Sequence, residues 1–503
     1  MGLFVRKVKT RSGATAVQIA HTRRGVQTIL EHVGSAHDDA QLAALVQIAK
    51  DKIQGGQQAF DLDALSPAAP VTDAPTVAGS ASRVLWEVLE EIYVRLGFDA
   101  IGDDVFRKLV LARVVEPTSK ADTIRVLDEL GVPAPSLRTI WRTLARCVEH
   151  DWRDRASRAA YAHATKAGGL SLVLYDVTTL YFEAEDEDEL RKVGMSKERR
   201  VDPQIVVGLL VTPDGFPLEV HAFTGNTAET RTLIPVLRSF QDRHGVKDLV
   251  VAADAGMLSA GNLNALEDAG FGFIVGSRIS KAPYDLFEYF AHGSALSDGE
   301  TLESKRMMGT GENARERRIV YHYSYKRDKR DNHTLNKQIE RAQKVVDGTR
   351  PVKKDRFVKL TGTRRGIDQA LVDRARQVAG LKGYVTNIPA TLQSGREVVA
   401  AYHSLFQVEA SFRMAKTDLR ARPMFHHEHD SIQAHLTIVF TALAVSRHLQ
   451  EITGVSIRKL VRALRPLRDI TVNIGGNKII ATTPPGPEAA AILDAIKQSR
   501  ITH

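Results

Sequence analysis

The spacing of apolar and polar residues changes several times along the chain, and each change predicts a different kind of element. Residues 3–33 alternate in the manner of strands around turns at RSG and RRG, which predicts a three-stranded meander. Residues 38–53 have the apolar spacing of a helix. Residues 55–82 are rich in Gly, Pro, Ala and Ser and predict a linker. From 83 to 168 the spacing is helical throughout, with Gly- and Pro-containing turns.

An α/β pattern begins with LSLVLYDVTTLYF, residues 170–182, an apolar strand that contains Asp176. A carboxylate in such a strand is costly unless something pairs with it, so a turn cap, an ion pair and a functional site all remain open. A hairpin, a helix, a strand ending on Asp254, a second helix and a further strand follow. This order is that of a ribonuclease-H-like sheet, in which Asp176 and Asp254 would lie side by side.

A third carboxylate lies in GREVVAAYHSLFQVEASFRMAKTDLRA, which predicts one long helix. Tyr402, Glu409 and Lys416 are spaced by seven residues, so two turns of helix place them in one stripe. Arg413, four residues after the Glu, lies beside them. Two Asp and one Glu are hard oxygen ligands of the kind that suits two Mg²⁺ ions in phosphoryl transfer.

The positive charge is concentrated in one part of the chain. The 503 residues carry a net charge of +9, whereas residues 305–365 hold 19 Lys and Arg against 7 Asp and Glu, a net +12. Tyr321, Tyr323 and Tyr325 are interleaved with them, which favours a nucleic-acid surface; a solvated, ion-paired face is the alternative. Helices around VPAPS have helix-turn-helix spacing, but any helical bundle contains such pairs.

Several features predict no site of their own. The single cysteine, Cys147, lies on an apolar helical stripe and is expected in the core. His426, His427 and His429 predict an exposed loop cluster, because no Cys or carboxylate spacing completes a metal site. The acidic run after residue 182 predicts a solvated loop. The longest apolar run near the C-terminus is too short to span a bilayer, so a soluble protein is expected.

These motifs together resemble the DDE transposases of bacterial insertion sequences, in the branch with a β-rich insertion between the second Asp and the Glu. The resemblance is carried by YDVTTLYF, PLEVHAFTGNTAET, VVAADAGMLS, YVTNIP and YHSLFQVEASFRMAK, and is densest over 170–278 and 384–440. The last motif resembles the branch signature Tyr, two residues, Arg, three residues, Glu, six residues, Lys. Tyr402, Glu409 and Lys416 fit that signature, whereas Leu405 stands at the Arg position.

The resemblance implies an enzyme that binds the terminal inverted repeats of a mobile element, hydrolyses a strand at each end and joins the 3′ ends to target DNA. It implies Asp176, Asp254 and Glu409 as catalytic metal ligands for two Mg²⁺ ions, replaceable by Mn²⁺. Tyr402, Arg413 and Lys416 would contact DNA. A homodimer on double-stranded DNA in a bacterial cytoplasm is expected, with no membrane. A nuclease or resolvase that does not join strands, and a non-catalytic DNA-binding relative, remain alternatives.

The fold expected from these observations is an α/β multidomain protein. A ribonuclease-H-like mixed-sheet core is interrupted by a β-rich basic insertion and preceded by a helical DNA-binding region. The predicted domains are a small α+β module (1–54), a linker (55–82), a helical DNA-binding domain (83–168), the first part of the core (169–281), the basic insertion (282–382), the second part of the core with the Glu helix (383–450) and a C-terminal helix and strand tail (451–503).

Overall fold

The chain forms two compact units, each described here by itself. The computed structural model describes residues 3–9, 15–23, 26–36, 39–57, 76–183, 186–195, 201–246, 248–257, 259–277, 286, 296–351, 355–361, 364–474 and 477–500. One unit comprises Met1–Thr76 with Ile474–Asn477, and the other comprises Val77–Asn473 with Lys478–His503. Most of the predicted linker lies outside the described residues.

The first unit has the predicted meander and helix. Strands β1 (Leu3–Lys9), β2 (Thr15–Arg23) and β3 (Val26–Ala36) form an antiparallel sheet in that order, and α1 (Asp39–Gln57) packs on it. Val17 and Ala49 are fully buried between sheet and helix. Apolar and polar residues alternate along the strands, so the apolar residues gather on one face of the sheet, and that face packs on the helix.

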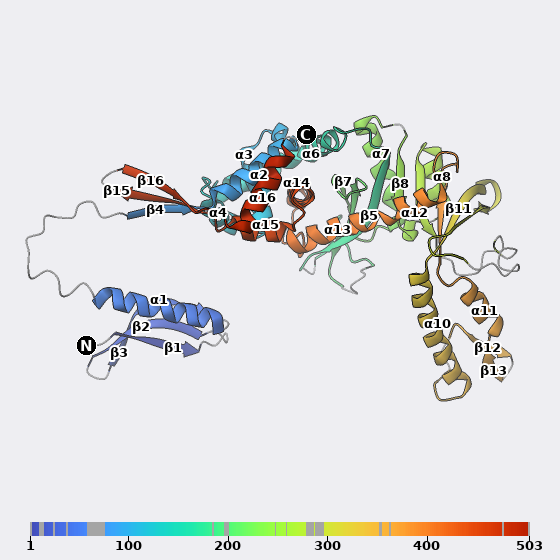
Figure 1. The fold of residues 1–503 in the computed structure, drawn as a ribbon, viewed down its shortest axis with the longest axis horizontal. Helices are drawn as coiled ribbons and strands as arrows, with labels where there is room; N and C mark the ends of the chain where they lie inside the picture. Colours follow the sequence, from blue (N-terminus) through green and yellow to red (C-terminus); the bar gives the residue numbers. More distant parts are fainter. Residues whose placement is uncertain are drawn as a thin grey trace, which may run out of the picture. The chain divides into compact units, whose positions relative to one another are not determined.

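A helical bundle surrounds α14 (His429–Thr453) in the second unit (Figure 1). This helix is apolar on nearly all sides, and such a helix is stable only when its neighbours cover it. Those neighbours are α2 (Arg83–Arg95), α3 (Asp104–Val115), α5 (Leu137–Glu149), α6 (Trp152–Ala164), α15 (Ile457–Leu464) and α16 (Pro487–Ser499). Cys147 is buried in this bundle, as predicted, and burial raises the pKa of its thiol to about 12.

An eight-stranded mixed sheet forms the centre of the second unit, in the order β10-β11-β14-β9-β8-β5-β6-β7. β8 (Val250–Ala253) pairs in parallel with β5 (Leu172–Tyr181) and β9 (Gly272–Ser277). The hairpin of β6 (Gln204–Val211) and β7 (Pro217–Thr224) continues the sheet beyond β5 in antiparallel fashion. Helices α7 (Leu233–His244) and α8 (Ala260–Asp268) connect the parallel strands, so the chain is an α/β protein with a mixed sheet.

Part of the predicted β-rich insertion belongs to the central sheet. β10 (Thr301–Met308) and β11 (Arg315–Tyr323) extend the central sheet, because β11 pairs with β14 (Leu381–Thr386), which pairs with β9. The rest is dominated by the 22-residue helix α10 (Tyr325–Val346). With β12 (Val358–Thr361), β13 (Arg364–Ile367) and α11 (Gln369–Gln377), it encloses a small core of its own.

The predicted single Glu helix is wrong. α12 (Gly395–His403) ends before α13 (Phe406–Arg413), because the amides of Leu405 and Gln407 bond three residues back and tighten the turn. Met414–Asp418 then forms the π-helical turn η6.

The predicted linker and tail share a small sheet. The end of the predicted linker forms strand β4 (Thr76–Ala81), in the sheet order β16-β15-β4 with β15 (Asp469–Ile474) and β16 (Asn477–Thr482). The predicted helix and strand tail therefore includes β15 and β16. Within the described ranges, no helix combines the length and apolar character that crossing a bilayer requires.

Candidate active site

The register of the central sheet places Asp176 and Asp254 next to each other. Tyr175 is paired with Ala253 in the parallel ladder of β5 and β8, and the two aspartates are the next residues on the two strands. Neighbouring strands lie about 4.8 Å apart, and laterally paired residues point to the same face. Tyr175 and Ala253 are buried on the opposite face, whereas Asp176 is half-buried and Asp254 is exposed.

Tyr402 reaches this pair from helix α12, which packs on β9 and β8. Its phenol donates a 3.0 Å hydrogen bond to Oδ1 of Asp254. Burial and the negative charge of Asp254 raise the pKa of Tyr402 well above its usual value, so the phenol remains the donor. Gly276 of β9 makes the approach possible, because a Cβ at that position would lie 2.3 Å from the Tyr402 hydroxyl.

Lys382 of β14 is a site residue that the sequence reasoning missed. Its ammonium lies 4.1 Å from the ring centroid of Tyr402 and 5.6 Å from that of Tyr384, which are cation–π distances. Burial lowers the pKa of Lys382, and the Asp254 carboxylate partly restores it. A lone lysine within the apolar strand LKGYVT was the signal that could have revealed it.

Lys416 lies beside the other aspartate. It lies in η6 and donates a short hydrogen bond to the hydroxyl of Thr178. Thr178 is two residues after Asp176 on β5, so both point to the same face of the sheet. A π-turn shifts the side chains that follow it relative to an α-helix, and such turns are frequent at functional sites.

Glu409 and Arg413 lie between these two anchors. Tyr402 and Lys416 hold the two ends of the segment on the face that carries both aspartates, and α13 between them packs on β5 and β6. The charge of Glu409 is close enough to contribute to the raised pKa of Tyr402. Both Glu409 and Arg413 are exposed, and neither forms an ion pair with another described residue.

The three predicted carboxylates form only part of a metal site in this structure. Asp176 and Asp254 offer adjacent hard oxygen ligands of the type that Mg²⁺ prefers. Among the described residues, however, no group of three or more His, Cys, Asp or Glu side chains is gathered closely enough to hold an ion. The structure therefore brings two of the three predicted ligands together and leaves Glu409 on the helix that crosses the same face.

Leu405 is buried, whereas the prediction of an exposed histidine loop holds only in part, because His426 is half-buried and His429 begins α14. Leu405 is 9% exposed and directly precedes α13, so the residue at the Arg position of the resembled signature packs in the core. His427 and His429 are exposed. His426 is partly buried, and burial lowers its pKa to about 3.

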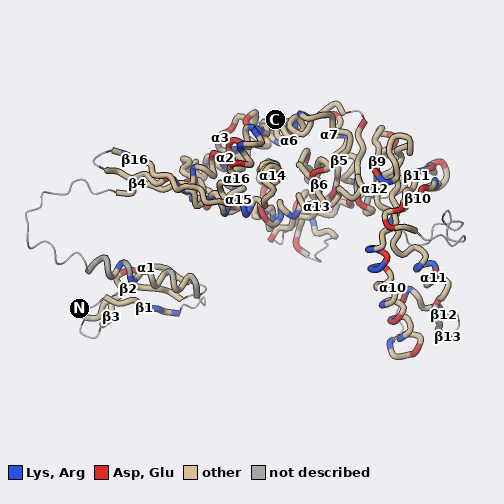
Figure 2. Tube along the Cα trace, viewed as in Figure 1, with Lys and Arg blue, Asp and Glu red and all other residues tan. Residues whose placement is uncertain are grey.

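The basic stretch of residues 305–365 divides into two parts. On β11, three arginines are paired with acids: Arg315 and Arg317 with Glu267, and Arg318 with Glu303. Along α10, most Lys and Arg side chains are exposed. Their positions are the blue segments of that helix in Figure 2. The alternative of an ion-paired face therefore holds for β11, whereas the exposed cations of this stretch lie on α10.

Comparison with known proteins identifies the family. The family described as "Transposase DDE domain" matches residues 167–445, more than half of the chain. No curated protein is significantly similar to the sequence.

Two solved structures show low similarity. A piggyBac transposase synaptic complex with hairpin DNA is 10% identical at a TM-score of 0.36, over 82% of this chain and 74% of that one. A Mos1 transposase paired-end complex with the left transposon end is 11% identical at a TM-score of 0.16, over 45% and 66%. Such scores establish no shared fold, whereas the match over residues 167–445 shows that this chain belongs to the DDE transposase domain family.

Proposed function

We propose that this chain is the transposase of a bacterial insertion sequence. It binds the terminal inverted repeats of its element as a homodimer, cleaves DNA at the ends and joins the freed 3′ ends to target DNA. The observation that carries the proposal is the adjacency of Asp176 and Asp254 on the sheet face crossed by residues 395–418, which carry Glu409 and are anchored through Tyr402 and Lys416. The central strand order, with β5 between β6 and β8, supports a ribonuclease-H-like core.

In this proposal each side chain has a defined task. Asp176 and Asp254 would hold divalent cations, Mg²⁺ or Mn²⁺, and Glu409 would complete the ligand set. Such ions would help to activate the attacking oxygen and to stabilise the leaving one. Tyr402 orients Asp254 through its hydrogen bond.

The cations of the site act on the substrate. Arg413 and Lys416 hold phosphates of the bound strand as charge-assisted donors. Lys382 supplies a further positive charge at the Asp254 side of the site. The exposed cations of α10 grip the DNA outside the site, and α5 is the recognition helix of the helical region.

The two reaction steps share one chemistry. A water oxygen first attacks the phosphorus at the transposon end, the bond from phosphorus to the 3′ oxygen breaks, and that oxygen takes up a proton. The resulting 3′ hydroxyl then attacks a phosphorus of target DNA, loses its proton and displaces a second 3′ oxygen. Positioning and electrostatic stabilisation account for most of the catalysis in such transfers.

The test uses the full chain and duplexes that carry the DNA flanking its gene, with Mg²⁺ and a target plasmid. Strand-joined products support transposition, whereas cut but unjoined ends identify a nuclease or resolvase instead. Asp176→Asn, Asp254→Asn and Glu409→Gln should each abolish cutting. Asp242→Asn is the matched control, because Asp242 is an exposed carboxylate on α7 with no assigned task. Equal cutting by all four variants would refute the proposal.

A further inference from the structure

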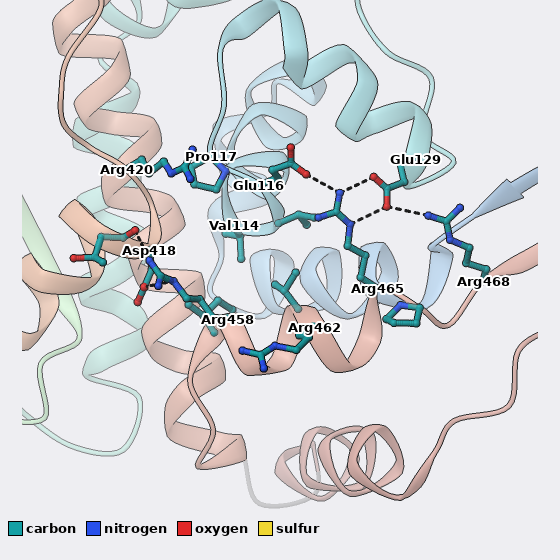
Figure 3. Close-up of a pocket in the computed structure, with 15 residues that line it drawn as sticks. Val114, Glu116, Pro117, Glu129, Asp418, Arg420, Arg458, Arg462, Arg465 and Arg468 are labelled. Carbon is teal, nitrogen blue, oxygen red and sulfur yellow. Dashed lines mark hydrogen bonds and ion pairs between the residues drawn. The ribbon is translucent and has the colours of Figure 1, made fainter. Parts of the chain in front are cut away.

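A pocket of about 950 Å³ lies where the helical bundle meets the end of the Glu segment (Figure 3). Its wall begins at Thr417 and Asp418, directly after Lys416. Two residues span at most about 7.6 Å of chain. This is about the length of two or three nucleotides along a DNA strand, so the pocket begins within that distance of the catalytic face. Val114, Val115, Ile457 and Val461 give it an apolar floor.

Five arginines line this pocket against three carboxylates, and three of the five are neutralised. Arg465 lies 2.6 Å from both Glu116 and Glu129, and Arg468 lies 3.1 Å from Glu129. Arg458 lies 2.7 Å from Asp418. These pairs fix the walls of the pocket.

The other two arginines, Arg420 and Arg462, are exposed and form no ion pair or side-chain hydrogen bond with the described residues. In Figure 3 no dashed line joins Arg420 or Arg462 to another residue of the pocket, whereas such lines join Arg465 and Arg458 to their acidic partners. Arg458 and Arg462 of α15 and Arg465 at its C-terminal cap are spaced i, i+4, i+7, so they form one stripe beside the apolar residues Ile457 and Val461. The pocket therefore offers two uncompensated guanidinium groups.

The backbone at Arg420 is strained into this position. Its φ of 45° lies in the left-handed region, which is unfavourable for a residue other than glycine. The buried Arg113 holds the segment there by donating to the carbonyls of Leu419 at 2.7 Å and Arg420 at 3.3 Å. Strain that the surroundings maintain is a feature of ligand-binding segments.

We propose that this arginine pocket binds the phosphate backbone of the DNA strand that leaves the active site along η6. The inference rests on the proposed function and adds a second contact region, separate from α10. Free guanidinium groups on a rigid wall suit phosphodiester oxygens, and the apolar floor suits the sugars between them. The pocket is too large and open for a single small anion.

Binding of a fluorescein-labelled duplex that carries the gene-flanking DNA tests the pocket. Arg420→Gln combined with Arg462→Gln should weaken binding about tenfold at 0.1 M salt and reduce the slope of log K against log salt by about two. Arg158→Gln combined with Arg238→Gln is the matched control, because it also removes two charges from exposed arginines, on α6 and α7, that do not line the pocket. Affinity and slope equal to those of the control would overturn the inference.

Cross-linking locates the strand. Cys147 is buried, so Arg462→Cys adds an exposed thiol that can form a disulfide with DNA carrying a thiol tether at one chosen phosphate. Yield should peak at a phosphate within about three nucleotides of the cut site, and no peak above that of Arg158→Cys would overturn the inference. If DNA cutting depends on Asp176 but the cross-linking yield shows no such peak, only the inference about the pocket is refuted. If the yield shows the peak but no DNA is cut, only the proposed function is refuted.

Discussion

Replacing Gly276 with alanine should uncouple Tyr402 from Asp254. The added Cβ would lie 2.3 Å from the phenol oxygen, whereas ordinary contact begins near 3.4 Å, so the phenol must retreat by about 1 Å. A retreat of this size breaks the 3.0 Å hydrogen bond to Asp254. A hydrogen bond to a charged group contributes about 1.5–3 kcal/mol. If that energy orients Asp254 in the transition state, strand cutting slows about 10- to 150-fold.

The assay is single-turnover cutting of gene-flanking DNA with Mg²⁺, together with urea unfolding of the same variant. Gly208→Ala is the matched control, because its Cβ would lie 2.4 Å from the hydroxyl of Tyr175 on the opposite face of the sheet. In both variants, overpacking should lower the free energy of unfolding by about 1–3 kcal/mol, but only Gly276→Ala should cut DNA more slowly.

A double-mutant cycle sharpens the test. In a Tyr402→Phe background the hydrogen bond to Asp254 is already absent, so Gly276→Ala should slow cutting much less than it does in the wild type. The reasoning is refuted if Gly276→Ala cuts at the wild-type rate, if Gly208→Ala slows cutting equally, or if the two effects at Gly276 and Tyr402 simply add.

Three further predictions follow from the electrostatics. Electron paramagnetic resonance measures Mn²⁺ binding, and in the absence of DNA this binding should be weaker in Asp176→Asn and Asp254→Asn than in the wild type. Glu409→Gln should weaken Mn²⁺ binding only when DNA is present, because Glu409 is not gathered with the two aspartates. Equal effects of all three variants without DNA would contradict this prediction. Lys337, Arg341 and Lys344 form an exposed stripe on α10, and changing all three to Gln should lower the salt slope of DNA binding by about 2–3; an unchanged slope would exclude α10 as a DNA surface. Burial alone raises the pKa of Glu219, but hydrogen bonds with His221 and Arg243 outweigh it and hold the pKa below its usual value. The stabilising contribution of Glu219 is therefore present above the unfolded-state pKa of about 4.3 and is lost as pH falls through the folded-state pKa. In Glu219→Gln, the free energy of unfolding in urea should therefore depend less on pH in the acid range. An unaltered pH dependence would disprove this role of Glu219.

The sequence by itself determined the elements that local patterning specifies. Alternation predicted the meander of residues 3–33, and the apolar strands around Asp176 and Asp254 were correctly predicted, because a strand buried on both faces needs a continuous apolar run. Ser136 and Ser259 cap helices, as their positions before apolar periods predict. The chain order of strands and helices predicted that the two aspartates would be neighbours, and the register of β5 and β8 places them so.

Only the tertiary structure decided where the helix of Glu409 breaks and what its ends hold. A seven-residue spacing suits a straight helix, but the turn at Leu405 and the π-turn at Lys416 depend on how this segment packs on the sheet. Lys382 and Gly276 belong to the site through strand pairing across more than a hundred residues, which no local pattern encodes. The insertion joined the central sheet for the same reason: the hydrogen bonds of β11 are satisfied by β14, a partner that lies far away in sequence.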